Sequence, residues 1–171
     1  MTKNSVMIRE YQDRDKKECR ALWWELTEHH REIYNDASFG GADPGRFFDD
    51  HLERVGPHRV WVAEQNRIIV GMIGLLDGDT GAEIEPLVVK HEYRRQGIGK
   101  KLLQFVIQEA KSLGLKDLSI KPVVRNIDAI KAFYLLGFQN LGHIELFIDL
   151  KPEKRREWKS NLNLFGLDFN Y

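Results

Sequence analysis

The spacing of apolar residues predicts a strand and two helices in the first third of the chain. A short apolar run at 6–8 predicts a first strand, and Cys19 and Leu22 belong to a set of apolar residues that recurs at helical spacing to about position 30. Residues 35–45 are rich in Asn, Asp, Gly and Pro, a composition typical of a loop. We therefore expect two helices joined by this loop, the second ending at Gly56.

Segments rich in β-branched residues follow and predict two consecutive hairpins. Residues 58–65 and 68–76 are separated by a compact polar turn, and a second turn leads into a strand over 82–89. That strand passes directly into a glycine-containing turn and an amphipathic helix that ends at Gly114.

The last third of the chain predicts a further strand and helix before a tail. We expect a strand over 117–124, a helix capped by Asn126 and a last clear strand over 143–150. A short charged helix over 152–158 should follow, and the alternation of apolar and polar residues at 161–171 is strand-like.

Chain length and composition favour one globular domain. Of the 171 residues, 42% are apolar and 30% are charged, an ordinary globular balance. Lys plus Arg and Asp plus Glu number 26 each, so no summed field would attract nucleic acid or an anionic membrane surface. We therefore expect neither nucleic acid nor a membrane as a partner.

Cysteine content and the N-terminal segment bear on metal binding and compartment. The single cysteine, Cys19, excludes an intrachain disulfide and a multi-cysteine metal site, and it lies among core-facing residues. No metal is expected. The start of the chain lacks the apolar core of a signal peptide, and no stretch approaches a membrane span. These features predict a soluble, cytoplasmic protein.

The turn between the strand at 82–89 and the next helix has the features of an anion site. Gly97 and Gly99 lack side chains, so backbone can approach a ligand closely, and the first-turn N–H groups of the helix point at that ligand. The helix dipole, Arg95 and Lys100 add positive charge, as does Arg94. The pyrophosphate of a nucleotide cofactor fits this description.

Two other nucleotide motifs do not fit the same turn. A Walker pattern needs Ser or Thr where Lys101 stands, and a dinucleotide fingerprint needs a third glycine where Leu102 stands. Both motifs are therefore disfavoured.

The run at 87–103 resembles the strand-turn-helix signature of the GNAT superfamily of N-acyltransferases, in which Arg or Gln, two residues, Gly, one residue and Gly or Ala follow each other. Arg94, Gly97 and Gly99 match it. The segment 126–138 is similar to a later helix of the same family. It contributes six matches: Asn126, Ala129, Phe133, Tyr134, Gly137 and Phe138. With the flanking strands, the resemblance covers roughly residues 60 to 150, and a weaker match of the N-terminal pattern extends it towards the start of the chain. It therefore implies one domain over 1–150 and a C-terminal extension over 151–171.

The resemblance implies an α+β, three-layer αβα fold: a mixed, mostly antiparallel sheet with a splayed central strand pair and helices on both faces. It implies acetyl-CoA as the acyl donor, with pantetheine between the splayed strands and pyrophosphate on the turn. The cofactor contacts implied are Leu87, Val88, Val89, Arg94, Arg95, Gln96, Gly97, Ile98, Gly99, Lys100 and Asn126.

Glu83 and Glu85 are candidates for the general base. An alkylammonium acceptor has a pKa near 10.4 and must lose a proton before it attacks a thioester. With a period of two, both glutamates would share a face with Leu87 and Val89, and Glu85 is the nearer. A merely solvated carboxylate is the alternative.

Tyr134 matches the family's proton donor to the departing thiolate, with core packing beside Phe133 and Phe138 as the alternative. A backbone N–H of Leu87 or Val88 can donate a hydrogen bond to the acyl oxygen and so serve as an oxyanion hole. Four aromatic residues of the first helix and its loop are candidates for either an acceptor pocket or the core: Trp23, Trp24, Tyr34 and Phe39.

These residues together predict an N-acetyltransferase that moves the acetyl group of acetyl-CoA to a primary amine by direct attack in a ternary complex. The alternative is an acyl-CoA-binding sensor without turnover. The acceptor stays open among small molecules, peptide N-termini and lysines. The extension at 151–171 is expected to pack either on its own domain or on a second subunit, which would make a homodimer.

Overall fold

The computed structural model describes residues 5–78, 81–148, 150 and 158–171. They form two compact units, Met1–Lys121 and Pro122–Tyr171. The division into 1–150 and 151–171 stays a prediction.

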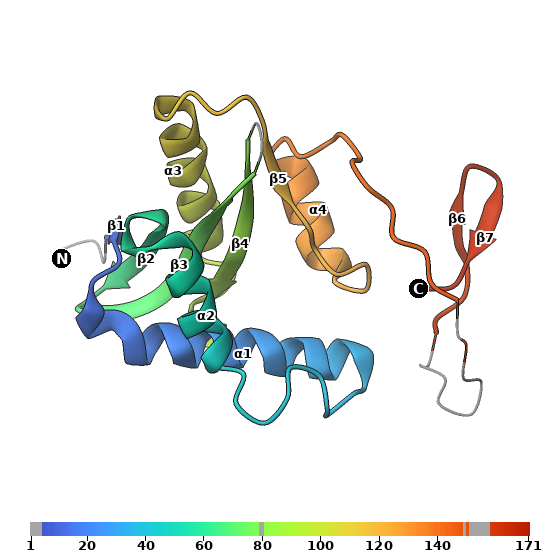
Figure 1. The fold of residues 1–171 in the computed structure, drawn as a ribbon, viewed down its shortest axis with the longest axis horizontal. Coiled ribbons are helices and arrows are strands. Elements are labelled where there is room, and N and C mark those ends of the chain that lie inside the picture. Colours follow the sequence, from blue (N-terminus) through green and yellow to red (C-terminus); the bar gives the residue numbers. More distant parts are fainter. Residues whose placement is uncertain (1–4, 79–80, 149, 151–157) are drawn as a thin grey trace. The chain divides into compact units, whose positions relative to one another are not determined.

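The first unit is built on a five-stranded sheet (Figure 1). The strands lie in the order β1 (Met7–Glu10), β2 (Val60–Gln65), β3 (Ile68–Asp77), β4 (Ala82–Val89) and β5 (Leu118–Ile120). Neighbouring strands are antiparallel except for β4 and β5, which are parallel. The predicted mixed, mostly antiparallel sheet is thus confirmed.

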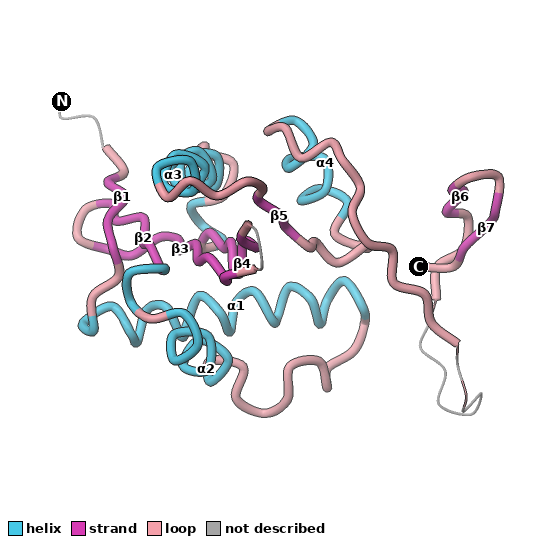
Figure 2. The backbone as a smooth tube through the Cα atoms, turned by 45° about the horizontal axis from the view of Figure 1, so that its top comes forward, coloured by secondary structure: helices cyan, strands magenta, loops and turns pink. Residues whose placement is uncertain are grey.

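Helices cover both faces of this sheet (Figure 2). α1 (Lys16–Tyr34) and α2 (Arg46–Val55) lie on one face, and α3 (Ile98–Ser112) lies on the other. The three-layer arrangement is confirmed. Among the described residues, none of the helices combines the length and the apolarity needed to cross a bilayer.

The core between α1, α2 and the sheet is formed by the apolar faces that periodicity predicts. Cys19, Leu22 and Phe48 are at most 3% exposed and pack with Met72 and Val88 of the sheet. Burial raises the pKa of the Cys19 thiol above its ordinary value, so this cysteine is an unreactive core residue.

The strand β4 and the edge strand β5 part after a short common stretch. Residues 82–84 of β4 pair with β5, and the pairing described for the two strands ends there, although β4 continues to Val89. β5 is shorter than the predicted strand at 117–124, because Pro122 has no N–H to extend a ladder. The parting agrees with the predicted splay, although the pair lies at the edge of the described sheet and not at its centre.

The described part of the second unit contains one helix and one hairpin. The helix α4 (Ile127–Leu135) begins after Asn126, whose side-chain oxygen accepts the N–H of Ala129 at 3.2 Å. The hairpin is formed by β6 (Leu162–Leu164) and β7 (Leu167–Phe169). A strand-like segment was predicted there, and the structure shows two strands.

The strand predicted at 143–150 is wrong for the part of it that the structure describes. Residues 143–148 carry no strand, and Ile144, Leu146 and Ile148 are 50%, 69% and 82% exposed. Alternation indicates a strand only where a neighbouring strand supplies hydrogen-bond partners, and no pairing is described here. The helix predicted at 152–158 lies almost wholly outside the described residues.

Candidate active site

The glycine turn joins β4 to α3 as the sequence predicts. Gly97 is the N-cap of α3 and has a left-handed backbone, with φ of 80°. A Cβ placed on Gly97 would have no heavy atom within 4 Å, so the space beside it is open. The first helical hydrogen bond runs from the Lys101 N–H to the Gly97 carbonyl at 3.0 Å. The amide groups of 98–100 precede that bond, where a helix offers its N–H groups to an anion.

Arg94 supports the turn from the protein side. Its Nε donates to the Val89 carbonyl at 3.0 Å, and a terminal nitrogen donates to Glu25 of α1 at 3.2 Å. Glu25 also accepts the N–H of His91 at 2.5 Å. Arg94 therefore ties the end of β4 to α1, a role that the sequence pattern did not reveal. Its contact with a phosphate stays a prediction, as do those of Arg95 and Lys100.

A β-bulge interrupts β4 where the strands part. The pairing of β3 with β4 shifts between Ile73 and Leu75, so that Gly74 faces two residues of β4, Glu85 and Pro86. A methyl group on Gly74 would lie 2.5 Å from the Glu85 carbonyl oxygen. The bulge therefore depends on glycine at this position.

The bulge changes which side chains share a face. Glu83 pairs with Leu76 and Val88 pairs with Met72, and these two β3 residues lie on one face of the sheet. Glu83 therefore shares a face with Val88 and not with Leu87. The shared face expected from strict alternation is wrong, because one extra residue reverses the alternation beyond it.

Glu85 has the electrostatic surroundings of a proton acceptor. Burial raises the pKa of its half-buried carboxyl, the neighbouring charge of Glu83 raises it further, and Arg54 and Lys121 lower it. Glu83 itself is paired with Lys121, whose Nζ lies 2.5 Å from Oε2. Glu85 thus has a pKa displaced towards neutral pH, as a general base requires.

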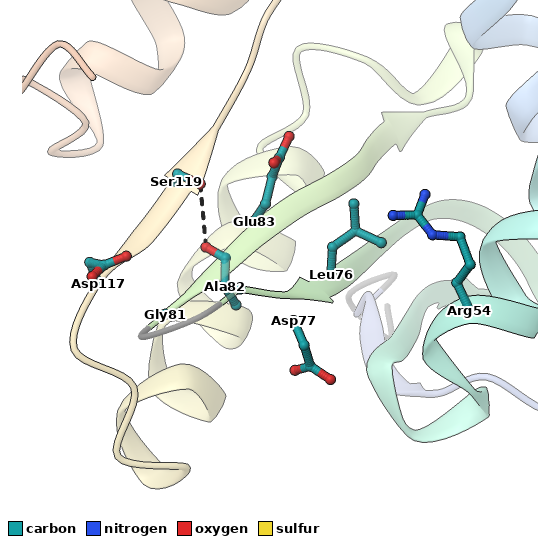
Figure 3. A pocket seen from close by; sticks show the side chains of 9 residues that line it. Arg54, Leu76, Asp77, Gly81, Ala82, Glu83, Asp117 and Ser119 are labelled. Atoms are coloured by element: carbon teal, nitrogen blue, oxygen red, sulfur yellow. Dashed lines mark hydrogen bonds between the residues drawn. The ribbon is translucent and has the colours of Figure 1, made fainter. Parts of the chain in front are cut away.

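A cavity of about 350 Å³ opens beside the start of β4 (Figure 3). Two of its lining residues are joined by a hydrogen bond, from the Ser119 hydroxyl to the Ala82 carbonyl at 3.4 Å. Both signs of charge reach it, so it suits a polar ligand. It is lined by Arg54, Leu76, Asp77, Gly78, Gly81, Ala82, Glu83, Asp117 and Ser119.

The aromatic residues proposed for an acceptor pocket divide into two groups. Tyr34 and Phe39 stack with ring centroids 6.1 Å apart, and Arg31 fixes the loop by donating from Nε to the Phe39 carbonyl at 2.8 Å. Trp23 instead packs on Phe48 with centroids 6.5 Å apart, as a core residue does. Tyr34 and Phe39 remain the pocket candidates of this helix and loop, together with the 42% exposed Trp24.

Asn126 and Tyr134 belong to the second unit, whereas the other predicted site residues belong to the first. Asn126 is a helix cap, as the sequence predicts. Tyr134 is 56% exposed, while Phe133 and Phe138 pack edge to face at 6.3 Å. The contributions of Asn126 and Tyr134 to the site stay predictions. Within the described part of the chain, no three His, Cys, Asp or Glu side chains are grouped as metal ligands.

Comparison with known proteins agrees with the geometry. Residues 16–138 match the Acetyltransferase (GNAT) family. The chain belongs to the GNAT family. This assignment confirms the resemblance carried by the glycine turn and the later helix.

GNAT proteins similar in sequence are N-acetyltransferases by name. N-acetyltransferase 8 of Rattus norvegicus is 33% identical over 96 residues, which are 53% of this chain and 42% of that protein. N-acetyltransferase 8 of Homo sapiens is 32% identical over 88 residues, 48% of this chain and 39% of that protein. The GNAT chain thus matches less than half the length of these relatives.

Solved structures show the same fold. A GNAT-family acetyltransferase from Staphylococcus aureus Mu50 superposes with a TM-score of 0.65 at 23% identity, over 78% of this chain and 84% of that one. A putative acetyltransferase from Salmonella typhimurium, solved with its cofactor acetyl-CoA, gives a TM-score of 0.62 at 22% identity, over 78% and 79%.

Proposed function

We propose that this GNAT chain is an acetyl-CoA-dependent N-acetyltransferase that acts on a primary amine by direct attack in a ternary complex. The observation that carries the proposal is the parting of β4 from β5 directly before an open glycine turn at the N-terminus of α3. A strand edge without a ladder offers its amides to pantetheine, and a helix N-terminus offers its amides to pyrophosphate.

The residues of the first unit suit this donor. Backbone groups of 87–89 would bond the pantetheine amides, and those of 96–100 would hold the pyrophosphate with help from Arg95. The thioester would then lie near the bulge at Glu85, where an N–H of Leu87 or Val88 can polarise its carbonyl.

Transfer to an ammonium group releases two protons from the nitrogen, and the departing thiolate takes up one. Glu85 would take the proton from the ammonium group, so that the amine nitrogen can form a bond to the acyl carbon while the carbon–sulfur bond breaks. Tyr134 would give a proton to the departing sulfur and regain one from the nitrogen of the tetrahedral intermediate. The cavity beside Glu83 supports a polar acceptor, and its class stays open among small amines, peptide N-termini and lysines.

Replacing Glu85 with glutamine should lower kcat/KM about 100-fold at neutral pH, because the amide cannot accept the proton. In the wild type, activity should fall as the pH drops through a pKa above the ordinary glutamate range, since burial favours the protonated carboxyl. The variant should lose this acidic limb. CoA release measured against a panel of amines checks both results.

Glu83→Gln is the matched control, because Glu83 is already paired with Lys121 and should tolerate the change better. Equal rates for Glu85→Gln and wild type would place the base elsewhere. Binding of acetyl-CoA without CoA release on any amine would instead favour the sensor alternative.

We also propose that the C-terminal hairpin joins two copies into a homodimer. Its turn exposes Phe165 by 79% and Leu167 by 60%, whereas its open end is fixed within its own unit by the hydrogen bond from Arg125 Nε to the Tyr171 carbonyl at 3.0 Å. A two-stranded hairpin alone is marginally stable. Its like edges can pair with those of a second copy about a two-fold axis.

Deleting residues 161–171 should therefore convert a dimer into a monomer, with mass measured by light scattering. A wild-type protein that is already monomeric would contradict the proposal and favour docking on the chain's own sheet. A dimer that survives the deletion would place the interface elsewhere.

A further inference from the structure

His51 is a buried polar residue without an evident structural role. It lies on α2 and is 2% exposed, with the Trp23 ring on one side at a centroid distance of 5.5 Å. Both ring nitrogens are buried, and neither has a hydrogen-bond partner among the described residues. Buried polar atoms are rarely left in this state, so each one calls for an explanation.

The His51 ring is neutral at physiological pH. Burial lowers its pKa to about 4, and the nearby charge of Arg54 contributes in the same direction. A neutral imidazole carries one N–H donor and one acceptor nitrogen. His51 can therefore donate one hydrogen bond and accept another without bringing a charge into the core.

One ring nitrogen faces the bulge of β4. A methyl group on Gly74 would lie 2.6 Å from Nε2 of His51 and 2.5 Å from the Glu85 carbonyl oxygen. The two atoms thus crowd the same point above Gly74, which leaves no room for a water molecule between them, and a small turn of the ring lets Nε2 donate directly to the carbonyl oxygen. The Nε2 atom is the one that this geometry directs to the bulge.

We propose that His51 is a positioning residue for acetyl transfer: its Nε2 donates to the Glu85 carbonyl and fixes the bulge. The inference rests on the proposed function. The Glu85 carboxylate is the proposed general base. The next two backbone amides, of Leu87 and Val88, are those expected to donate a hydrogen bond to the acyl oxygen. A shift of about 1 Å in such groups can cost roughly 100-fold in rate.

The test compares three substitutions in the full chain. His51→Leu removes both nitrogens and should lower kcat 10-fold to 100-fold with little change in KM for the amine. His51→Gln places an amide nitrogen near the position of Nε2 and should restore most of the rate. His51→Asn reaches only the position of Nδ1 and should not.

Phe48→Leu is the matched control, because Phe48 is fully buried one turn earlier on α2 and also packs on Trp23. It should lower the melting temperature without changing kcat. If Phe48→Leu slows the reaction as much as His51→Leu, or if His51→Gln and His51→Asn behave alike, the positioning role is overturned.

A second readout is independent of turnover. Amide hydrogen exchange at Leu87 and Val88 should speed up about 10-fold in His51→Leu and return towards wild type in His51→Gln. Unchanged exchange in His51→Leu would refute the inference. If exchange responds as expected but the wild type acetylates no amine, the proposed function fails while the support of the bulge by His51 stands.

Discussion

Replacing Gly97 with valine should abolish most of the rise in melting temperature that acetyl-CoA gives to the wild-type protein. Gly97 has a φ of 80°, a conformation that a β-branched residue rarely adopts, and its open side is where the proposed pyrophosphate would lie. A ligand at 100 times its Kd stabilises a fold by about 2.7 kcal/mol, so a large loss of affinity removes most of the shift.

Gly114→Val provides the control for backbone strain. Gly114 follows the other end of α3 and has a φ of 71°, and a Cβ placed on it would likewise have no heavy atom within 4 Å. The control should lower the melting temperature of the free protein and keep the shift with acetyl-CoA. A full shift in Gly97→Val would show that the cofactor binds elsewhere.

Replacing Tyr134 with phenylalanine should lower turnover 10-fold to 1000-fold, with little change in acetyl-CoA affinity. The free thiol of CoA has a pKa of about 8.5, like that of a cysteine, so a nearby proton donor eases departure of the thiolate. The hydroxyl would act during transfer and not in binding, so kcat and kcat/KM should fall together. Steady-state CoA release and a binding titration measure the two effects separately.

Tyr11→Phe removes a hydroxyl from the core, where the Tyr11 oxygen has no hydrogen-bond partner among the described residues. It should leave turnover unchanged. A wild-type rate for Tyr134→Phe would assign Tyr134 to packing or to the surface.

The elements that periodicity predicts well are those whose apolar faces are buried against each other. The helix that carries Cys19 and Leu22 and the turn at Gly97 both occur as predicted, because local pattern and tertiary burial agree. The strand at 143–150 failed because alternation says nothing about whether a paired neighbour exists.

The details of the site were less accessible from sequence. The bulge at Glu85 reverses the side-chain faces by one residue, and its signals were Pro86 within a strand and Gly74 in the strand opposite. The sequence carries no signal for the role of His51, because only the tertiary structure buries this residue of α2. The pairing of Arg94 with Glu25 joins residues 69 positions apart, beyond the reach of a local motif.

The bond between Arg94 and Glu25 has a consequence for selectivity. Glu25 already offsets the guanidinium charge of Arg94, so Arg94 would add little net attraction for the proposed pyrophosphate. The proposed site would then recognise a pyrophosphate through the amide dipoles at the start of α3, with Arg95 and Lys100 as the remaining cations. Such dipoles discriminate by the spacing and angle of phosphate oxygens, so the proposed site would favour ligands of the right shape over polyanions in general.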